Sequence, residues 1–231
     1  MTSTTKNFKS AAKTVIQDTE VQSHLKGLYS GFNMARIHEA EATPNWEDLQ
    51  NRAQAIKFHT IENLDYYLDM AATNVEKAGG HVYFAKDAAA ASDYVLKVAK
   101  ENGVRTVIKG KSMISEEMEL NQQLAEKEIE AIETDLGEYL IQLAGQTPYH
   151  IIVPAIHMSR GEVAEILSDN LGTPKDATIE EMAGAARDEL RDKFVQADMG
   201  ITGANFLVAE TGTLTLVTNC LLYTSPSPRD G

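Results

Sequence analysis

Cysteine is almost absent from this sequence: the 231 residues contain one, Cys220. A single cysteine cannot form a disulfide within the chain, nor can it hold an iron–sulfur cluster, which takes about four thiolates. Basic residues are also scarce, with 21 Lys and Arg against 34 Asp and Glu, so the formal net charge is −13. Binding to nucleic acid relies on clustered Lys and Arg, and the composition therefore excludes it as the expected function.

Long apolar runs are missing as well. No stretch reaches the roughly 20 apolar residues that span a bilayer, and residues 1–10 lack the apolar run of a secretory signal. We therefore expect a cytoplasmic protein without a transmembrane segment. The chain is 43% hydrophobic, which at this length is enough for one domain with a sizeable core.

The first 60 residues show helical spacing only. Apolar residues recur at helical intervals from Phe8 to Ile16, and further helices are expected over residues 20–41, before Pro44, and over residues 46–58. We expect residues 1–60 to form a helical N-terminal extension.

From residue 61 onward, predicted helices and strands alternate. The pattern predicts helices over residues 62–77, 87–101, 116–127, 136–144, 161–169 and 179–196, and strands over residues 81–85, 104–108, 129–133 and 150–153. The Gly/Thr-rich residues 199–218 predict strands with a tight turn around residues 210–213. Strands separated by helices favour an α/β domain over residues 61–219, with a mostly parallel sheet and helices on both faces.

The last twelve residues, CLLYTSPSPRDG, break the pattern of the preceding strand. One back-translation of this segment matches a transposase-type sequencing adapter. We expect residues 220–231 to be read-through from such an adapter and the native sequence to stop at Asn219. The alternative is a disordered tail rich in Pro and Ser, and the nucleotide sequence decides between the two.

Three loops follow predicted strands, and ligands of open parallel sheets bind outside the carboxyl ends of the strands. The first loop is residues 109–117, KGKSMISEE, in which Lys109, Lys111 and Ser112 are candidates to bind an anion at a helix N-terminus. The alternative is structural: Ser115 caps the next helix. The spacing of a P-loop is absent.

The second loop is residues 154–162, PAIHMSRGE. Ser159 and Glu162 have the spacing of a capping box, which explains both structurally. His157 and Arg160 are left as candidates, because histidine titrates near neutral pH and arginine can bind a carboxylate with two hydrogen bonds.

The third loop runs from residue 197 through residue 213 and contains two Gly-bearing segments. Its candidate binding residues are Thr202, Asn205, Glu210 and Thr211, and the alternative is a pair of turns in a small sheet. The histidines show no metal-ligand spacing, so no metal site is expected. No catalytic residue can be assigned.

Several segments resemble the LUD (lactate utilization) domain family. They are ETDLGEYLIQLAG at residues 133–145, PAIHMSRGEVAEIL at residues 154–167 and ADMGITGANFLVAETGTLTLVTN at residues 197–219. The helical first 60 residues resemble the opening of the iron–sulfur subunit in this family, so the resemblance covers nearly all of residues 1–219.

The resemblance implies a fold of the NagB/RpiA/CoA-transferase group. It also implies a subunit of a cytoplasmic complex that oxidises L-lactate to pyruvate, with other subunits as partners. In the family, the iron–sulfur subunit carries two [4Fe–4S] clusters in a ferredoxin-like segment after the LUD domain. The cluster cysteines are missing here, so we expect no cofactor in this fragment and truncation before that segment. Whether the chain is an enzyme by itself stays open.

Two other functions stay open. Glu210, at a Gly-rich strand end, would suit an enzyme of the CoA-transferase or sugar-phosphate isomerase type. Arg160 would suit a non-catalytic module that binds a small carboxylate or assembles partner subunits. An incomplete sheet would expose an edge and an apolar patch, so we expect the fragment to be poorly soluble.

Overall fold

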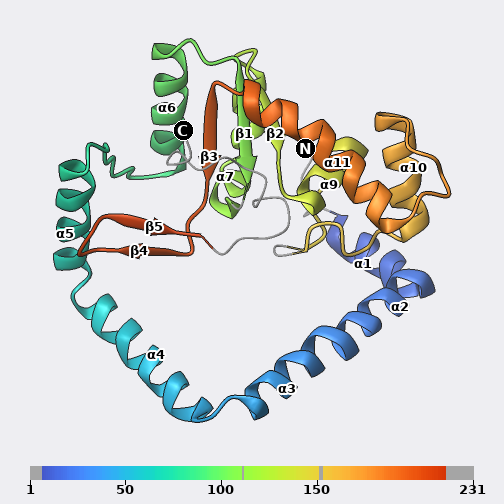
Figure 1. Ribbon diagram of the computed structural model, residues 1–231, viewed down its shortest axis with the longest axis horizontal. Coiled ribbons are helices and arrows are strands. Elements are labelled where there is room, and N and C mark those ends of the chain that lie inside the picture. Colours follow the sequence, from blue (N-terminus) through green and yellow to red (C-terminus); the bar gives the residue numbers. More distant parts are fainter. Residues whose placement is uncertain (1–6, 111, 151–152, 217–231) are drawn as a thin grey trace. The chain divides into compact units, whose positions relative to one another are not determined.

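A computed structural model describes residues 7–110, 112–150 and 153–216 (Figure 1). The contacts divide the chain into two compact units. One unit contains residues 1–70 with residues 156–158, and the other contains residues 71–155 with residues 159–231. The predicted adapter segment, residues 220–231, lies outside the described residues.

The first unit is helical, as its sequence predicts. Its helices are α1 (Phe8–Gln17), α2 (Thr19–Leu28), α3 (Met34–Ala42) and α4 (Trp46–Glu62), and a π-helical segment, Tyr29–Asn33, joins α2 to α3. Asp18 caps α2, because its carboxylate accepts hydrogen bonds from the backbone N–H groups of Glu20 and Val21. Helix α3 ends before Pro44, as expected. Helix α5 (Leu64–Lys77) crosses the boundary between the units.

The second unit is an α/β domain. Its further helices are α6 (Ala88–Glu101), α7 (Met113–Glu117), α8 (Leu120–Ala125), α9 (Leu136–Ala144), α10 (Arg160–Leu171) and α11 (Ile179–Gln196). Its strands are β1 (Thr106–Gly110), β2 (Glu130–Glu133), β3 (Met199–Thr202), β4 (Phe206–Val208) and β5 (Thr213–Thr215). The helices predicted over residues 136–144 and 179–196 have the predicted bounds.

Strands β1, β2 and β3 form a parallel sheet in the order β2-β1-β3, with β1 in the centre (Figure 1). Successive residues along the strands face opposite sides of the sheet, and each side has its own hydrophobic core. Val107 and Ala131 pack with Leu120 and Leu124 of α8, whereas Ile132 packs on the opposite face with a second cluster from α9 and α11. The prediction of a parallel sheet with helices on both faces is therefore confirmed.

The strand predicted over residues 81–85 is wrong. These residues have no strand pairing in the described structure, and the ring of Tyr83 instead stacks on Tyr94 of α6 with centroids 4.2 Å apart. Tyr83 is 49% exposed and Phe84 is 64% exposed, so the apolar run covers a helix and does not join the sheet.

The helix predicted over residues 116–127 is broken in two. Glu119 has a left-handed backbone with φ 54°, which ends α7 and begins α8. The side-chain amide of Gln123 donates to the carbonyl of Met118 at 2.7 Å and so satisfies a backbone group at the break. The expected cap is also wrong: Ser112 caps α7, and Ser115 lies inside that helix.

Two strand predictions differ in position. The strand predicted over residues 104–108 is β1, which begins two residues later, at Thr106. The carboxylate of Asp198 accepts hydrogen bonds from the backbone N–H groups of Arg105 and Thr106, and these bonds lower the pKa of Asp198. Residues 151–152 of the strand predicted over residues 150–153 lie outside the described residues, and the flanking His150 and Val153 lie in bends.

Strands β4 and β5 form an antiparallel hairpin, as the Gly/Thr-rich segment predicts. The side-chain amide of Asn74 in α5 donates to the carbonyls of Ala209 and Glu210 in the turn, at 2.9 and 3.0 Å. Gly212 has φ +69°, and a Cβ atom there would lie 2.5 Å from the backbone nitrogen of Val75. The turn thus needs glycine, both for its conformation and for its contact with α5.

In the described part of the chain, no helix combines the length and the apolar character that a membrane span requires.

Candidate functional site

The carboxyl ends of the three parallel strands carry polar residues that the register places side by side. Lys109 pairs with Glu133 across β1 and β2, and Gly110 pairs with Thr202 across β1 and β3. A Cβ atom at Gly110 would lie 2.7 Å from the hydroxyl oxygen of Thr134, so glycine permits the close approach of the strand ends. This edge of the sheet is where ligands of open α/β sheets bind.

Lys109 forms a buried ion pair with Glu133. The Lys109 Nζ atom lies 2.8 Å from Glu133 Oε1, and the two side chains are 1% and 7% exposed. Lys109 Nζ also donates to the hydroxyl of Ser115 at 3.1 Å. The ammonium group predicted to bind an anion is therefore engaged by a carboxylate and a hydroxyl of the protein itself.

Side-chain amides hold Glu133 in place from two helices. The amide of Asn121 in α8 donates to Glu133 Oε1 at 2.7 Å. The amide oxygen of Gln142 in α9 accepts from the Glu133 backbone N–H at 2.9 Å, and its nitrogen donates to the carbonyl of Ala131 at 2.7 Å. The end of β2 is thus fixed by groups on both faces of the sheet.

Glu138 is a second buried acid at this edge, in the first turn of α9, which begins directly after β2 and is capped by Asp135. The pKa of Glu138 is raised to about 8, mainly by burial and further by the charges of Glu133, Glu116 and Asp135 and a hydrogen bond with the Glu116 side chain. Two carboxyl groups that share a hydrogen bond need a proton between them, so Glu138 is a neutral acid at neutral pH.

Three buried oxygen atoms of this network have no hydrogen-bond partner within the described residues. They are Asn121 Oδ1, Glu133 Oε2 and Glu138 Oε2. A buried polar atom without a partner costs about 1–3 kcal/mol. All three atoms can accept hydrogen bonds, so the arrangement can bind a group that donates them.

Of the other predicted residues in the first two loops, Ser112 and Arg160 have structural contacts. The hydroxyl of Ser112 accepts from the backbone N–H of Ser115 at 3.4 Å, and Lys111 lies outside the described residues. Arg160 donates from Nη2 to the carbonyl of Ala177 at 3.0 Å, which joins the start of α10 to the loop before α11. His157 is half-buried in a turn that belongs to the first unit.

The predicted capping box of Ser159 and Glu162 is confirmed at the start of α10. Thr178 and Glu181 form a second capping box at the start of α11.

The candidates of the third loop are exposed. Thr202 ends β3 and donates from its hydroxyl to the carbonyl of Gly203 at 3.0 Å. The backbone N–H of Asn205 donates to the carbonyl of Thr215, and the hydroxyl of Thr211 donates to that of Thr213 at 2.8 Å. Glu210 lies in the hairpin turn. The structure therefore joins Thr202 to the sheet edge and places the other three in the hairpin region.

Sequence analysis missed Asn121, Glu133 and Glu138 as site residues. A signal for two of them was present, because Glu133 and Glu138 lie in the ETDLGEY stretch directly after a predicted strand, where ligand-binding residues gather. Asn121 carried no signal, since it lies in an ordinary polar helical stretch and meets Glu133 only in the fold.

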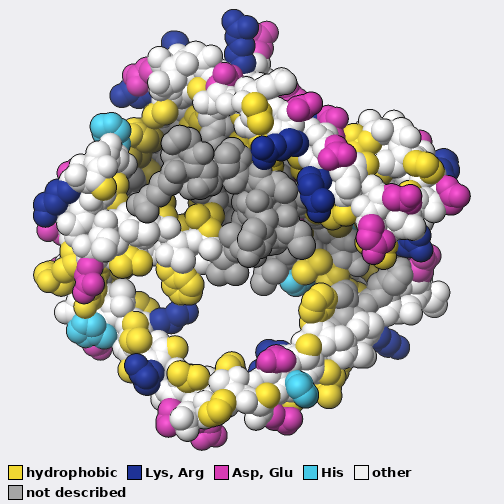
Figure 2. Space-filling view, viewed as in Figure 1, with side chains coloured by type: hydrophobic (Ala, Val, Ile, Leu, Met, Phe, Trp, Pro, Cys, Tyr) yellow, Lys and Arg dark blue, Asp and Glu magenta, His cyan; other side chains and the backbone are white. Residues whose placement is uncertain are grey.

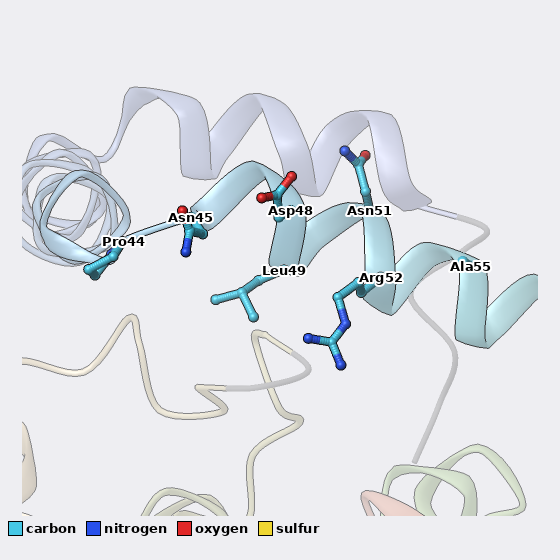
Figure 3. A pocket seen from close by; sticks show the side chains of 7 residues that line it. All are labelled: Pro44, Asn45, Asp48, Leu49, Asn51, Arg52 and Ala55. Carbon is cyan, nitrogen blue, oxygen red and sulfur yellow. The ribbon is translucent and has the colours of Figure 1, made fainter.

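A separate hollow of about 610 Å³ lies along α4 in the first unit. Figure 3 shows Leu49 and Arg52 pointing to one side of the helix and Asp48 and Asn51 to another, so these side chains do not converge on a common point. Among the described residues, no three or more His, Cys, Asp and Glu side chains are arranged to hold a metal ion.

Comparison with known proteins gives matches over most of the chain. The model of the LUD domain matches residues 68–220. The chain is 40% identical over 213 residues to lactate utilization protein B of Macrococcus caseolyticus, which is 92% of this chain and 45% of the relative. It is 44% identical over 188 residues to lactate utilization protein B of Oceanobacillus iheyensis, which is 81% of this chain and 39% of the relative.

The chain thus spans about half the length, or less, of the curated relatives it matches. No solved structure gives a significant match.

Proposed function

The chain belongs to the LUD domain family, and we propose that it is the LUD portion of a subunit that transfers electrons in a complex oxidising L-lactate to pyruvate. The support is the match over 92% of the chain to a protein named for lactate utilization. As part of this proposal, the complex is cytoplasmic, and the partners of the chain are its other subunits.

The electron-transfer part of the proposal requires iron–sulfur clusters, and the residues of this chain do not fit them. A [4Fe–4S] cluster is held by about four Cys thiolates, whereas the sequence has one cysteine. The described residues also offer no other metal-ligand group. We therefore derive no electron-transfer step for this chain, which spans 45% or less of the length of these relatives.

Disruption of the chromosomal gene tests the function. We expect the disrupted strain to lose growth on L-lactate as sole carbon source and to keep growth on pyruvate, because pyruvate enters metabolism after the proposed oxidation. The intact gene supplied on a plasmid should restore growth on L-lactate. Unimpaired growth on L-lactate, or an equal loss on pyruvate, would contradict the proposal.

A further inference from the structure

Helix α7, which follows β1 at its carboxyl end, is attached to the second unit chiefly by polar contacts (Figure 1). The residue that it buries is Ser115, and neither apolar cluster of the described residues contains a residue of this helix. Ile114 is 69% exposed. The Ser115 hydroxyl accepts from Lys109 Nζ at 3.1 Å and donates to the carbonyl of Ser112 at 2.6 Å. The position of α7 therefore depends on polar groups and their charges.

The second polar contact of α7 joins two carboxyl groups. Glu116 is half-buried and forms a hydrogen bond with Glu138 of α9, which is 8% exposed. Ionised carboxylates only accept hydrogen bonds, so this contact exists only while one of the two groups holds a proton. Once both are ionised, the hydrogen bond is lost and two like charges face each other where water has little access.

The surrounding charges add to this repulsion. Asp135, directly before α9, and Glu133 of β2 both act on Glu138, and Lys109 of β1 is paired with Glu133. Helix α10 also packs against α9, and its charged residues are all exposed. Helix α11 places the acid Glu189 beside α9. A new negative charge on Glu138 therefore meets further acids.

The chain on both sides of α7 has the features of a hinge. Glu119 has a left-handed backbone with φ 54°, which separates α7 from α8. Ser112, on the other side, has a non-helical backbone with φ −115° and ψ 86°. A few residues at the ends of elements absorb the changes of backbone angle when a short segment moves. Helix α7 can therefore move without unfolding its neighbours.

We propose that α7 is a latch at the carboxyl ends of β1 and β2, closed while Glu116 and Glu138 share a proton and released when both carboxyl groups are ionised. Release withdraws the Ser115 hydroxyl from Lys109, so water reaches the buried ion pair of Lys109 and Glu133 from this side. The latch is a property of the fold and does not depend on the proposed function.

The direction of the pH dependence follows from proton linkage. In the closed form the pKa of Glu138 is raised from 4.5 to about 8, and release gives the carboxyl group access to water, so its pKa falls toward the ordinary value. The preference for the closed form is complete below pH 4.5 and is lost as pH rises to about 8. Protection of the α7 amides from hydrogen exchange, corrected for the intrinsic rate, should fall at least about tenfold between about pH 5.5 and about pH 8.5.

Hydrogen exchange of the 231-residue chain, followed by mass spectrometry on peptides that cover residues 112–119, measures the latch. Glu138→Gln and Glu116→Gln each place an amide opposite the remaining carboxyl group, and an amide donates at any pH. Both variants should therefore keep their α7 protection at the two pH values. Glu117→Gln is the matched control, because it removes an exposed carboxylate from the same helix and should show the wild-type fall.

Peptides from α11 serve as the internal reference, and their protection should change far less than that of α7. Equal protection of α7 at the two pH values overturns the proposal. An equal loss in α11 also overturns it, because the whole domain would then open. The same holds if Glu138→Gln or Glu116→Gln shows the wild-type fall, or if Glu117→Gln abolishes it. If Glu138→Gln does not fold, Glu116→Gln, at a half-buried position, decides.

Discussion

The two units of the chain differ in how they bury their apolar residues. Every buried residue among those described belongs to the second unit, beginning at Ala71. In the first unit, α1, α3 and α4 contain no buried residue. Figure 2 shows apolar side chains at the surface, and those of the first unit include Phe8, Phe32, Ile56 and Phe58, each more than half exposed. Helical sequence pattern alone therefore does not produce a core.

The two units also differ in whether they bury charged residues. Charged residues of the first unit lie at its surface, whereas the second unit buries Lys109, Glu133 and Glu138 in one hydrogen-bonded network. Burial of charge costs free energy unless the charges are paired. Groups with perturbed pKa values are enriched at functional sites, and this network lies where the strands of a parallel sheet end.

Removal of one partner of the buried ion pair should have the largest effect on stability. Lys109→Met leaves the Glu133 carboxylate buried without its cation, which we expect to lower the free energy of unfolding by about 3–5 kcal/mol. The double variant Lys109→Met with Glu133→Leu should recover most of the loss. Urea unfolding measures both. Lys127→Met, at an exposed position, is the control, and an equal effect at the two lysines would refute the prediction.

Truncation of a core residue compares the units directly. Leu124 is 0% exposed in the second unit, and Ile56 is 62% exposed in the first. Leu124→Ala should lower the free energy of unfolding by about 2–5 kcal/mol. Ile56→Ala should change it by less than about 0.5 kcal/mol. Similar losses in urea titrations would mean that the first unit contributes apolar burial to the same cooperative fold.

Glu138→Gln should stabilise the protein. The pKa of Glu138 is raised from its ordinary value of 4.5 to about 8, so the unfolded chain releases this proton at a lower pH than the folded chain does. The stability that the group contributes is complete below pH 4.5 and is lost as pH rises to about 8. Each pKa unit corresponds to about 1.4 kcal/mol, and partial access of water reduces the total.

We therefore expect Glu138→Gln to be more stable than the wild type by roughly 1–3 kcal/mol at pH 8. The difference should shrink toward pH 4.5, the ordinary pKa of glutamate. Thermal unfolding at several pH values measures it. A variant that is less stable than the wild type at pH 8 would show that Glu138 is ionised in the fold.

Loss of a helix cap should have the smallest effect and should again separate the units. Thr178 caps α11, which contributes Leu190 to a core, and Asp18 caps α2 in the first unit. Thr178→Ala should lower the free energy of unfolding by about 1 kcal/mol. Asp18→Ala should change local helicity by circular dichroism and leave the main urea transition in place. A shift of that transition by Asp18→Ala would speak against the prediction.

Much of the fold could be predicted from the sequence because the signals are local. Asp135 and Gly145 mark the two ends of α9, and the capping box of Thr178 and Glu181 marks the start of α11. The break at Glu119 could not be predicted, because a left-handed glutamate gives no sequence signal. The strand prediction over residues 81–85 was wrong, because a short apolar run fits a buried strand and a segment that covers a helix equally well.

The site was predictable only in part. The first candidate loop contained Lys109, which lies with Glu133 at the carboxyl ends of the strands, the edge that the strand-end rule indicated. The partner of Lys109 could not be read from the sequence, because Glu133 follows 24 residues later and meets it through the parallel register of β1 and β2.

The sequence by itself determined most of the helices, several of their caps, the hairpin with its glycine turn, and the family to which the chain belongs. Each of these depends on residues that are neighbours in the chain. Tertiary structure alone decided which residues form the buried network and raised the pKa of Glu138. Lys109, Asn121, Glu133 and Glu138 come from four elements. Burial of their charges, which holds a proton on Glu138, exists only once the sheet and its helices have packed together.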